Sequence, residues 1–186
     1  ELWKSDGTAA GTVLVKDINS GSYGSSPHDL TEVDGTLFFV ADDGINGEEL
    51  WKSDGTAAGT VLVKDINPGS SNSYLRYLTK INGILFFTAD DGNGTKIWQS
   101  DGTSAGTIIA DFSVLPSDLG SFLGDLYFTA VDSSGTSRGL YRLNDAPTAV
   151  TLSNVVSTLP ENTNTASPIK VADIVVTDDA QGTNTL

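Results

Sequence analysis

Two acidic loops of the chain contain residue types that bind cations in other proteins. The first loop contains Asp42, Asp43 and Asn46, and the second contains Asp90 and Asp91. Calcium takes about six to eight oxygen ligands from carboxylates, amides and carbonyls. Both loops lack the full spacing and the final glutamate of an EF-hand loop. Asp-Gly and Asn-Gly pairs are also typical of hairpin turns, so a calcium site and a simple turn are both open interpretations.

Residues that could support catalysis are few. The one histidine, His28, follows a stretch rich in serine, glycine and proline, and the chain has no cysteine. These counts exclude Cys/His zinc sites, and no nucleophile elbow or glycine-rich phosphate loop is present. A carboxylate pair for glycoside hydrolysis stays open. However, the acidic clusters lie in repeated loops, whereas catalytic residues occur once per site, so we expect no enzymatic activity.

The chain is strongly acidic, with 24 Asp and Glu against 10 Lys and Arg and a net charge of −14. Nucleic acids and anionic membrane surfaces are bound by stripes of Lys and Arg, so this charge argues against both partners. It favours cations as ligands, although an acidic surface also serves solubility alone. No apolar run is long enough to span a bilayer.

The acidic loops belong to a repeated unit. The sequence ELWKSDGTAAGTVLVKDIN begins at Glu1 and again, letter for letter, at Glu49. Diverged copies begin at Lys96, as KIWQSDGTSAGTIIADF, and at Gly139, as GLYRLND. A period of roughly 40–50 residues is typical of repeat architectures. Because the first residue falls inside a unit, we expect this chain to be a fragment of a longer protein.

Each full repeat predicts four short β-strands. Apolar and β-branched runs in one repeat cover residues 29–33, 36–41, 49–52 and 60–64. Asp34-Gly35 is typical of a two-residue hairpin turn. The loops leave no room for helices of ordinary length. Four short antiparallel strands per repeat form the blade of a β-propeller, so we expect an all-β fold with a partial β-propeller of four-stranded blades. A solenoid-like β-array is the alternative.

An apolar residue and a tryptophan recur together once per repeat, at Leu2-Trp3, Leu50-Trp51 and Ile97-Trp98. Aromatic rings can stack on sugars, but recurrence at one strand position favours packing between neighbouring sheets. We therefore expect Trp51 and Trp98 to be buried.

Residues 1–143 resemble the ELWxxDGT repeat of secreted and surface proteins of bacteria, through the pattern ELWKSDGT…GT…LVKDI. The SDGT turn is also similar to the Asp-box hairpin of sialidase-type propellers, which implies a structural role. The aspartate of such a turn bonds nearby backbone amides, and its glycine supplies a positive φ. The matching turns are Ser5-Asp6-Gly7-Thr8, Ser53-Asp54-Gly55-Thr56 and Ser100-Asp101-Gly102-Thr103.

Residues 144–186 differ in composition, because aromatic residues vanish and Thr, Val, Asn and Asp dominate. The segments NDAP at 144–147, LPEN at 159–162 and VADIVVTDD at 171–179 resemble the start of a cadherin-like repeat of bacterial surface proteins. The resemblance implies an incomplete cadherin/Ig-like β-sandwich that binds calcium at a domain junction. Turn and loop chemistry is the alternative. The implied calcium ligands are Glu161, Asp178, Asp179, Asn144 and Asp145.

These features predict a non-catalytic, extracellular, calcium-binding adhesion or scaffold module of a larger bacterial surface protein. The expected location is outside the cell or on its surface. The expected partners are a cell-surface protein or polysaccharide and neighbouring domains of the same chain. The alternatives are a lectin-like propeller that binds polysaccharide and a non-catalytic appendage of a secreted enzyme. A lectin predicts exposed Trp or Tyr at the blade tips.

Overall fold

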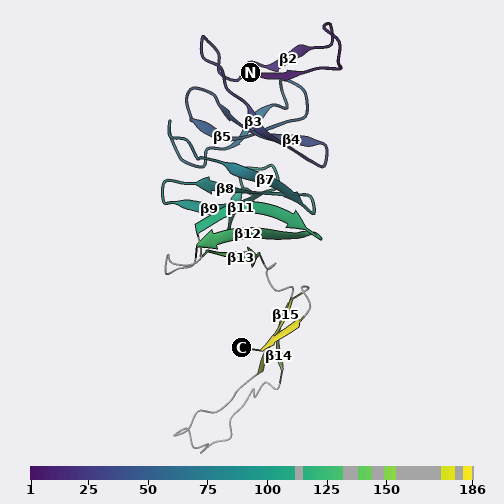
Figure 1. Ribbon diagram of the computed structural model, residues 1–186, viewed down its shortest axis with the longest axis vertical. Coiled ribbons are helices and arrows are strands. Elements are labelled where there is room, and N and C mark those ends of the chain that lie inside the picture. The colour runs from purple at the N-terminus through teal and green to yellow at the C-terminus, as the bar shows by residue number, and fades with distance from the viewer. Residues whose placement is uncertain (112–114, 132–137, 144–148, 154–172, 179–181, 186) are drawn as a thin grey trace, which may run out of the picture. The chain divides into compact units, whose positions relative to one another are not determined.

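The computed structural model describes residues 1–111, 115–131, 138–143, 149–153, 173–178 and 182–185. It divides into two compact units, Glu1–Leu143 and Asn144–Leu186. All regular elements in the described ranges are β-strands, and these ranges contain no helix (Figure 1). Accordingly, no described helix could cross a membrane. The predicted all-β class with small antiparallel sheets is confirmed.

The first unit contains four antiparallel sheets, and the strands of each follow one another in chain order. The first sheet pairs β1 (Leu2–Lys4) with β2 (Val13–Lys16). The second sheet holds β3 (His28–Val33), β4 (Thr36–Asp42), β5 (Glu48–Ser53) and β6 (Val61–Lys64). The third sheet holds β7 (Arg76–Ile81), β8 (Ile84–Asp90), β9 (Thr95–Ser100) and β10 (Ile108–Asp111). The fourth sheet holds β11 (Leu115–Phe122), β12 (Asp125–Val131) and β13 (Arg138–Arg142).

Strand β4 shows why its sequence is a continuous apolar run and not an alternating one. Phe39 and Ala41 pack with residues of the first sheet, whereas Phe38 and Val40 pack with residues of the third sheet. Successive side chains of a strand point to opposite faces. Both faces of the second sheet are therefore buried, and every central position of β4 has to be apolar.

The tryptophans of the second and third repeats pack against the sheet that precedes theirs in the chain. Trp51 packs with residues of the first sheet, and Trp98 packs with residues of the second. They are 6% and 5% exposed, which confirms the prediction that they are buried. Trp3 is 58% exposed, so the expectation of core packing is wrong there. Among the described residues, Trp3 has no preceding sheet to pack against.

The second unit contains one antiparallel sheet in the order β14 (Ala149–Ser153), β15 (Asp173–Asp178) and β16 (Gly182–Thr185). Val150 lies opposite Val176, and Val176 lies opposite Asn184 in the next pair of strands. This sheet is the described part of the segment for which the sequence predicts an incomplete β-sandwich.

The hairpin turns at the start of each repeat use two successive residues with positive φ. Asp34-Gly35 has φ angles of 48° and 85°, and Asn82-Gly83 has 48° and 81°. This is the geometry expected of a two-residue turn of the Asp-Gly and Asn-Gly type. The third turn has Leu123 at the first position, with φ of 53°, and its side chain is 87% exposed. Leucine disfavours this conformation because its Cβ approaches the backbone.

Replacing Leu123 with Asn is expected to stabilise the first unit by about 1 kcal/mol, because Asn tolerates positive φ better than leucine. The measurement is urea denaturation followed by tryptophan fluorescence. Leu123→Ala is the control, because it removes the exposed apolar side chain without adding the conformational preference of Asn. An equal gain in both variants would show that the backbone conformation is not the cause.

Candidate functional site

The recurring polar residues of the repeats gather at the junctions between successive sheets. They form an SDGT loop, a pair of lysines and a buried glutamate. The SDGT loops are residues 5–12, 53–60 and 100–107, each of which joins two strands of one sheet.

Each SDGT loop closes on itself through hydrogen bonds. In the second loop, Oδ1 of Asp54 accepts bonds from the backbone nitrogen of Thr56 at 2.8 Å and from its hydroxyl at 2.7 Å. The Thr56 hydroxyl in turn accepts a bond from the amide of Gly59 at 3.0 Å. The hydroxyls of Ser53 and Thr60 lie 2.7 Å apart and tie the two ends of the loop together. The expected bonding of the aspartate to nearby amides is confirmed.

The other two loops repeat this geometry. Asp6 accepts bonds from the nitrogen and the hydroxyl of Thr8 at 2.9 and 2.7 Å, and Asp101 accepts the same bonds from Thr103 at 2.8 and 2.7 Å. The threonine hydroxyl, followed by the threonine amide, lowers the pKa of each loop aspartate, including Asp54, below its ordinary value. These carboxylates are used to hold the loop.

Two lysines of the first sheet bind the SDGT loop of the second sheet. The ammonium group of Lys4 donates to the carbonyl of Gly55 at 3.0 Å. The ammonium group of Lys16 donates to the carbonyl of Thr60 at 2.8 Å. A crevice of about 260 Å³ lies beside Lys4 and Gly55. The closed loop therefore presents its carbonyl groups to the sheet before it.

The same pair of contacts recurs one sheet later. Lys52 donates to the carbonyl of Gly102 at 2.7 Å, and Lys64 donates to the carbonyl of Thr107 at 2.7 Å. The Lys64 ammonium also lies 5.7 Å from the ring centroid of Trp98, within the range of a cation–π interaction. A charged donor makes a stronger hydrogen bond than a neutral one. The lysine pairs therefore join the first sheet to the second and the second sheet to the third, in one direction along the chain.

The lysine pair follows a rule that is visible in the sequence but was missed in the sequence analysis. Each repeat that carries both lysines is followed by a repeat that carries an SDGT loop. The third repeat has Gln99 and Asp111 at the two lysine positions. The fourth copy, which begins at Gly139, has Leu143-Asn144 where the others have Ser-Asp. A comparison of the lysine positions of each repeat with the loop sequence of the next repeat would have revealed this pairing.

Glu49 is a second functional group that the sequence analysis did not single out. Its side chain is fully buried, and its carboxylate accepts hydrogen bonds from the amides of Ile66 at 2.9 Å and Asn67 at 3.3 Å. The hydroxyl of Ser73 also donates to it. Glu49 therefore links β5 to residues 66–73, which lie in the connection between the second sheet and the third. Burial raises its pKa to about 7, helped by the charge of Asp65 and opposed by these hydrogen bonds.

Glu1 makes the equivalent contacts in the first copy, with the amides of Ile18 and Asn19 and the hydroxyl of Ser25. Glu1 is only partly buried. Desolvation, the largest effect on its carboxyl, is therefore outweighed by these hydrogen bonds and the nearby terminal amine, and its pKa is lowered. The third copy has Lys96 at this position, where its ammonium group pairs with Asp91 at 2.5 Å. The same repeat position therefore holds a partly buried glutamate in the first copy, a fully buried glutamate in the second and a paired lysine in the third.

In the first acidic loop, the carboxylates bond to the loop itself. Oδ1 of Asp43 accepts the amides of Ile45 at 2.9 Å and Asn46 at 2.8 Å, and its other oxygen accepts the Asn46 side-chain amide at 2.8 Å. Asp42 accepts the amide of Gly44 at 2.6 Å. These backbone bonds are the contacts expected of a turn.

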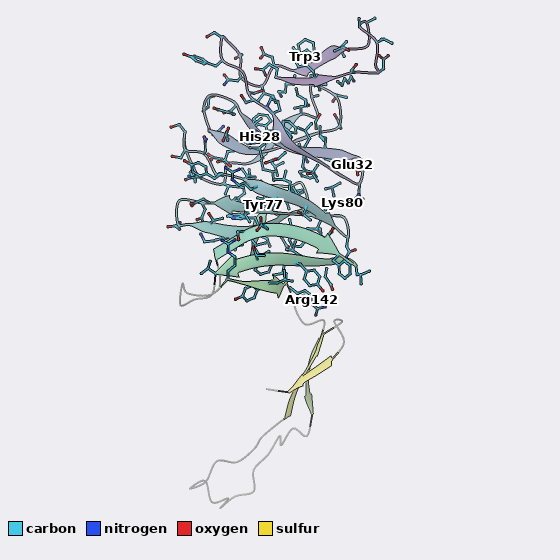
Figure 2. The ribbon with its side chains drawn as sticks, viewed as in Figure 1. Trp3, His28, Glu32, Tyr77, Lys80 and Arg142 are labelled. Carbon is cyan, nitrogen blue, oxygen red and sulfur yellow. The ribbon has the colours of Figure 1, made fainter. Side chains whose placement is uncertain are left out.

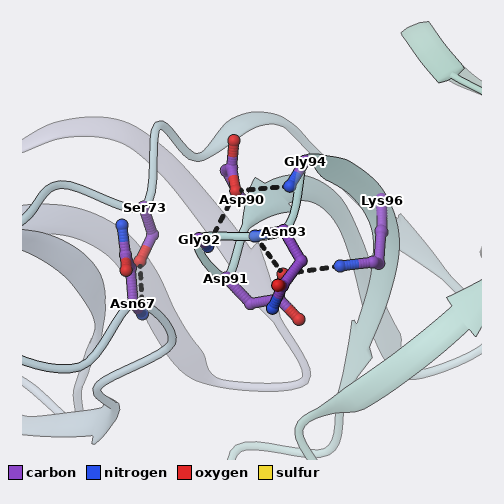
Figure 3. Close-up of polar contacts among 8 residues, drawn as sticks. All are labelled: Asn67, Ser73, Asp90, Asp91, Gly92, Asn93, Gly94 and Lys96. Carbon is purple, nitrogen blue, oxygen red and sulfur yellow. Dashed lines mark hydrogen bonds and ion pairs between the residues drawn. The ribbon is translucent and has the colours of Figure 1, made fainter.

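The second acidic loop is built in the same way (Figure 3). Oδ1 of Asp90 accepts the amides of Gly92 and Gly94 at 2.8 and 2.9 Å. Asp91 accepts the amide of Asn93 at 3.0 Å and also pairs with Lys96. The cation that pairs with Asp91 is therefore Lys96 of the same chain.

Most residues implied as calcium ligands lie outside the described residues, namely Asn144, Asp145, Glu161 and Asp179. Asp178 is the last residue of β15. Within the described residues, no group of three or more His, Cys, Asp and Glu side chains could hold a metal ion. The calcium assignments for both acidic loops and for residues 144–186 therefore stay predictions.

His28, which is exposed, lies at the start of β3. Its Nδ1 is 2.9 Å from the carbonyl oxygen of Ser26, which is a contact within its own connection between repeats.

No protein-family model, curated protein or solved structure matches the chain. The resemblances to ELWxxDGT and cadherin-like repeats therefore rest on the motifs of the sequence.

Replacing Gly59 with Ala is expected to destabilise the first unit by about 1–3 kcal/mol, the usual cost of overpacking. A Cβ at Gly59 would lie 2.1 Å from Cγ of Asp54, so the carboxylate would have to leave its hydrogen bonds to Thr56. Urea denaturation measures the loss. Gly24→Ala is the matched control, because its Cβ meets nothing within 4 Å. Equal losses in the two variants would contradict a specific role of the Asp54 bonds.

Replacing Glu49 with Gln is expected to change how stability depends on pH. The folded-state pKa of about 7 lies above the ordinary value of 4.5. The folded protein therefore binds the proton more tightly, and stability is lost as pH rises through this window. The free energy of unfolding of the wild type, relative to Glu49→Gln, is expected to fall by about 2 kcal/mol between pH 5 and pH 8. A difference that stays constant over this range would contradict the raised pKa.

Proposed function

We propose that this chain is a non-catalytic scaffold segment of an extracellular adhesion protein of the ELWxxDGT-repeat type. The observation that carries this proposal is where the recurring residues are used. The SDGT loops, the lysine pairs, Glu49 and two of the three recurrent tryptophans all join parts of the repeats to one another. A repeat whose recurring residues are used in this way is suited to presenting and spacing other domains.

The proposal includes a propeller-like arrangement of the sheets as blades. Its support is that each full repeat forms one four-stranded sheet, in chain order, and that the second and third sheets pack on both faces. Blades of a propeller have this strand order and these neighbours. A solenoid-like array would use the same contacts without closing a ring.

A lectin is the second candidate, and exposed aromatic residues favour it. Tyr74 and Tyr77 are 61% and 40% exposed, and Figure 2 shows Tyr77 on the third sheet. The equivalent positions of the preceding repeat are Ser26 and Asp29, and all four residues have positive φ. A glycan screen that compares the protein with Tyr74→Ser and Tyr77→Asp tests this candidate. Loss of glycan binding in those variants would favour the lectin.

Calcium is the proposed ligand of the adhesion segment, at the junction residues Asn144, Asp145, Glu161, Asp178 and Asp179. Its support is the motif resemblance together with the acidic net charge of −14. Calcium would neutralise part of this charge and hold neighbouring domains in a fixed relation.

Calcium is expected to raise the melting temperature of the intact chain relative to the same protein in chelator. At a calcium concentration about one hundred times Kd, preferential binding to the folded state adds about 2.7 kcal/mol of stability. The double variant Asp178→Asn, Asp179→Asn is expected to abolish the shift, as measured by scanning calorimetry. The double variant Asp42→Asn, Asp43→Asn is the control and is expected to keep the shift. If only this loop variant loses the shift, calcium binds the repeats and not the junction.

A further inference from the structure

The outer face of the first sheet is formed by a sequence that occurs again, in a buried environment, in the second sheet. Residues 1–19 repeat residues 49–67 letter for letter. Trp3 is 58% exposed and its counterpart Trp51 is 6% exposed, because the first sheet itself covers Trp51. Leu14 is also exposed, whereas its counterpart Leu62 packs partly buried against the first sheet. Figure 2 shows Trp3 on the side of the first sheet that faces away from the second.

The first sheet also lacks the neighbours that its counterpart has. Its strand β1 corresponds to β5, which pairs with β4 on one side and β6 on the other. Among the described residues, β1 pairs with β2 alone.

The SDGT loop on this face offers hydrogen-bond acceptors that are matched to two lysines. The carbonyls of Gly7 and Thr12 correspond to those of Gly55 and Thr60, which accept Lys4 and Lys16. The lysines of the described residues make their contacts elsewhere: Lys4, Lys16, Lys52 and Lys64 with the next sheet, Lys80 with Glu32 and Asp34, and Lys96 with Asp91. Closure by Asp6 holds this loop in the same form as the occupied loops.

We propose that the outer face of the first sheet binds a β-sheet of the same repeat type, whose strands carry lysines at the positions of Lys4 and Lys16. The lysines bond the Gly7 and Thr12 carbonyls, and the leucine at the position of Leu2 packs near Trp3. The evidence is continuity with an interface already present in this chain. There, Trp51 and Leu62, the counterparts of Trp3 and Leu14, bind such a sheet together with residues of β4. The face therefore recognises two lysine ammonium groups and one leucine side chain.

A second copy of this chain does not offer the required surface. The lysine-bearing faces of the first and second sheets are covered by the next sheet in the chain. The third sheet has Gln99 and Asp111 at the lysine positions. The proposed occupant is therefore a lysine-bearing repeat additional to those of residues 1–143. The inference rests on the proposed scaffold role, but the calcium and glycan experiments test that role separately.

The test is an extended chain in which a duplicate of residues 1–48 precedes Glu1, with phenylalanine in place of the added tryptophan. The measured quantity is the share of tryptophan fluorescence that iodide quenches. In the unextended chain, Trp3 is the exposed member of three tryptophans. In the extended chain, the quenched share is expected to fall almost to zero, because the added sheet covers Trp3. A Trp3 that stays accessible to iodide in a folded extended chain would overturn the proposal.

The matched control carries glutamine in place of both added lysines, because the third repeat carries Gln99 at one of these positions. Its urea midpoint is expected to be lower than that of the extended chain, and its quenched share higher. Equal values in the two proteins would overturn the recognition of lysines. Sedimentation of the unextended chain completes the test. A dimer in which Trp3 is protected would assign the face to a second copy and overturn the proposed occupant.

Discussion

Burial of both faces of the second and third sheets is the constraint on which the rest of this structure depends. A sheet of three or four short strands has too little core of its own, and it is stabilised by packing on its neighbours. Phe39 and Phe38, adjacent in β4, pack against different neighbouring sheets. Apolar burial supplies most of the stabilisation, at roughly 25 cal/mol per Å². It is non-directional, however, and does not by itself decide which sheet lies next to which.

Direction comes from the polar contacts at the sheet junctions. Each lysine pair reaches the carbonyls of a loop that is already closed by its own aspartate and threonine, so little further ordering is needed. Hydrogen bonds to charged groups contribute roughly 1.5–3 kcal/mol each, and a misplaced sheet would leave the ammonium groups and the carbonyls without these bonds. Glu49 acts on the same junction by holding the segment that carries the chain to the next sheet. Apolar burial thus provides the stability, and the lysine contacts match the first sheet to the second and the second sheet to the third.

The sequence predicted the features that depend on neighbouring residues in the chain. The strands, the turn at Asp34-Gly35 and the closure of the loop by Asp54 follow from short-range patterns and were confirmed. The burial of Trp51 followed from recurrence, and the same argument was wrong for Trp3. The lysine pairs and Glu49 were missed because their partners lie in another repeat or beyond the end of the strand. Lys16 and Thr60, for example, are 44 residues apart.

By itself, the sequence determined the all-β class, the repeat and the internal geometry of each SDGT loop, because these depend on backbone preferences and contacts within a few residues. The tertiary structure decided which identical residues are buried and which are exposed. Trp3 and Trp51 have the same local sequence and opposite environments, as do Glu1 and Glu49, whose pKa values move in opposite directions. The physical reason is that burial and desolvation depend on the neighbouring sheet, and identical sequences need not have identical neighbours.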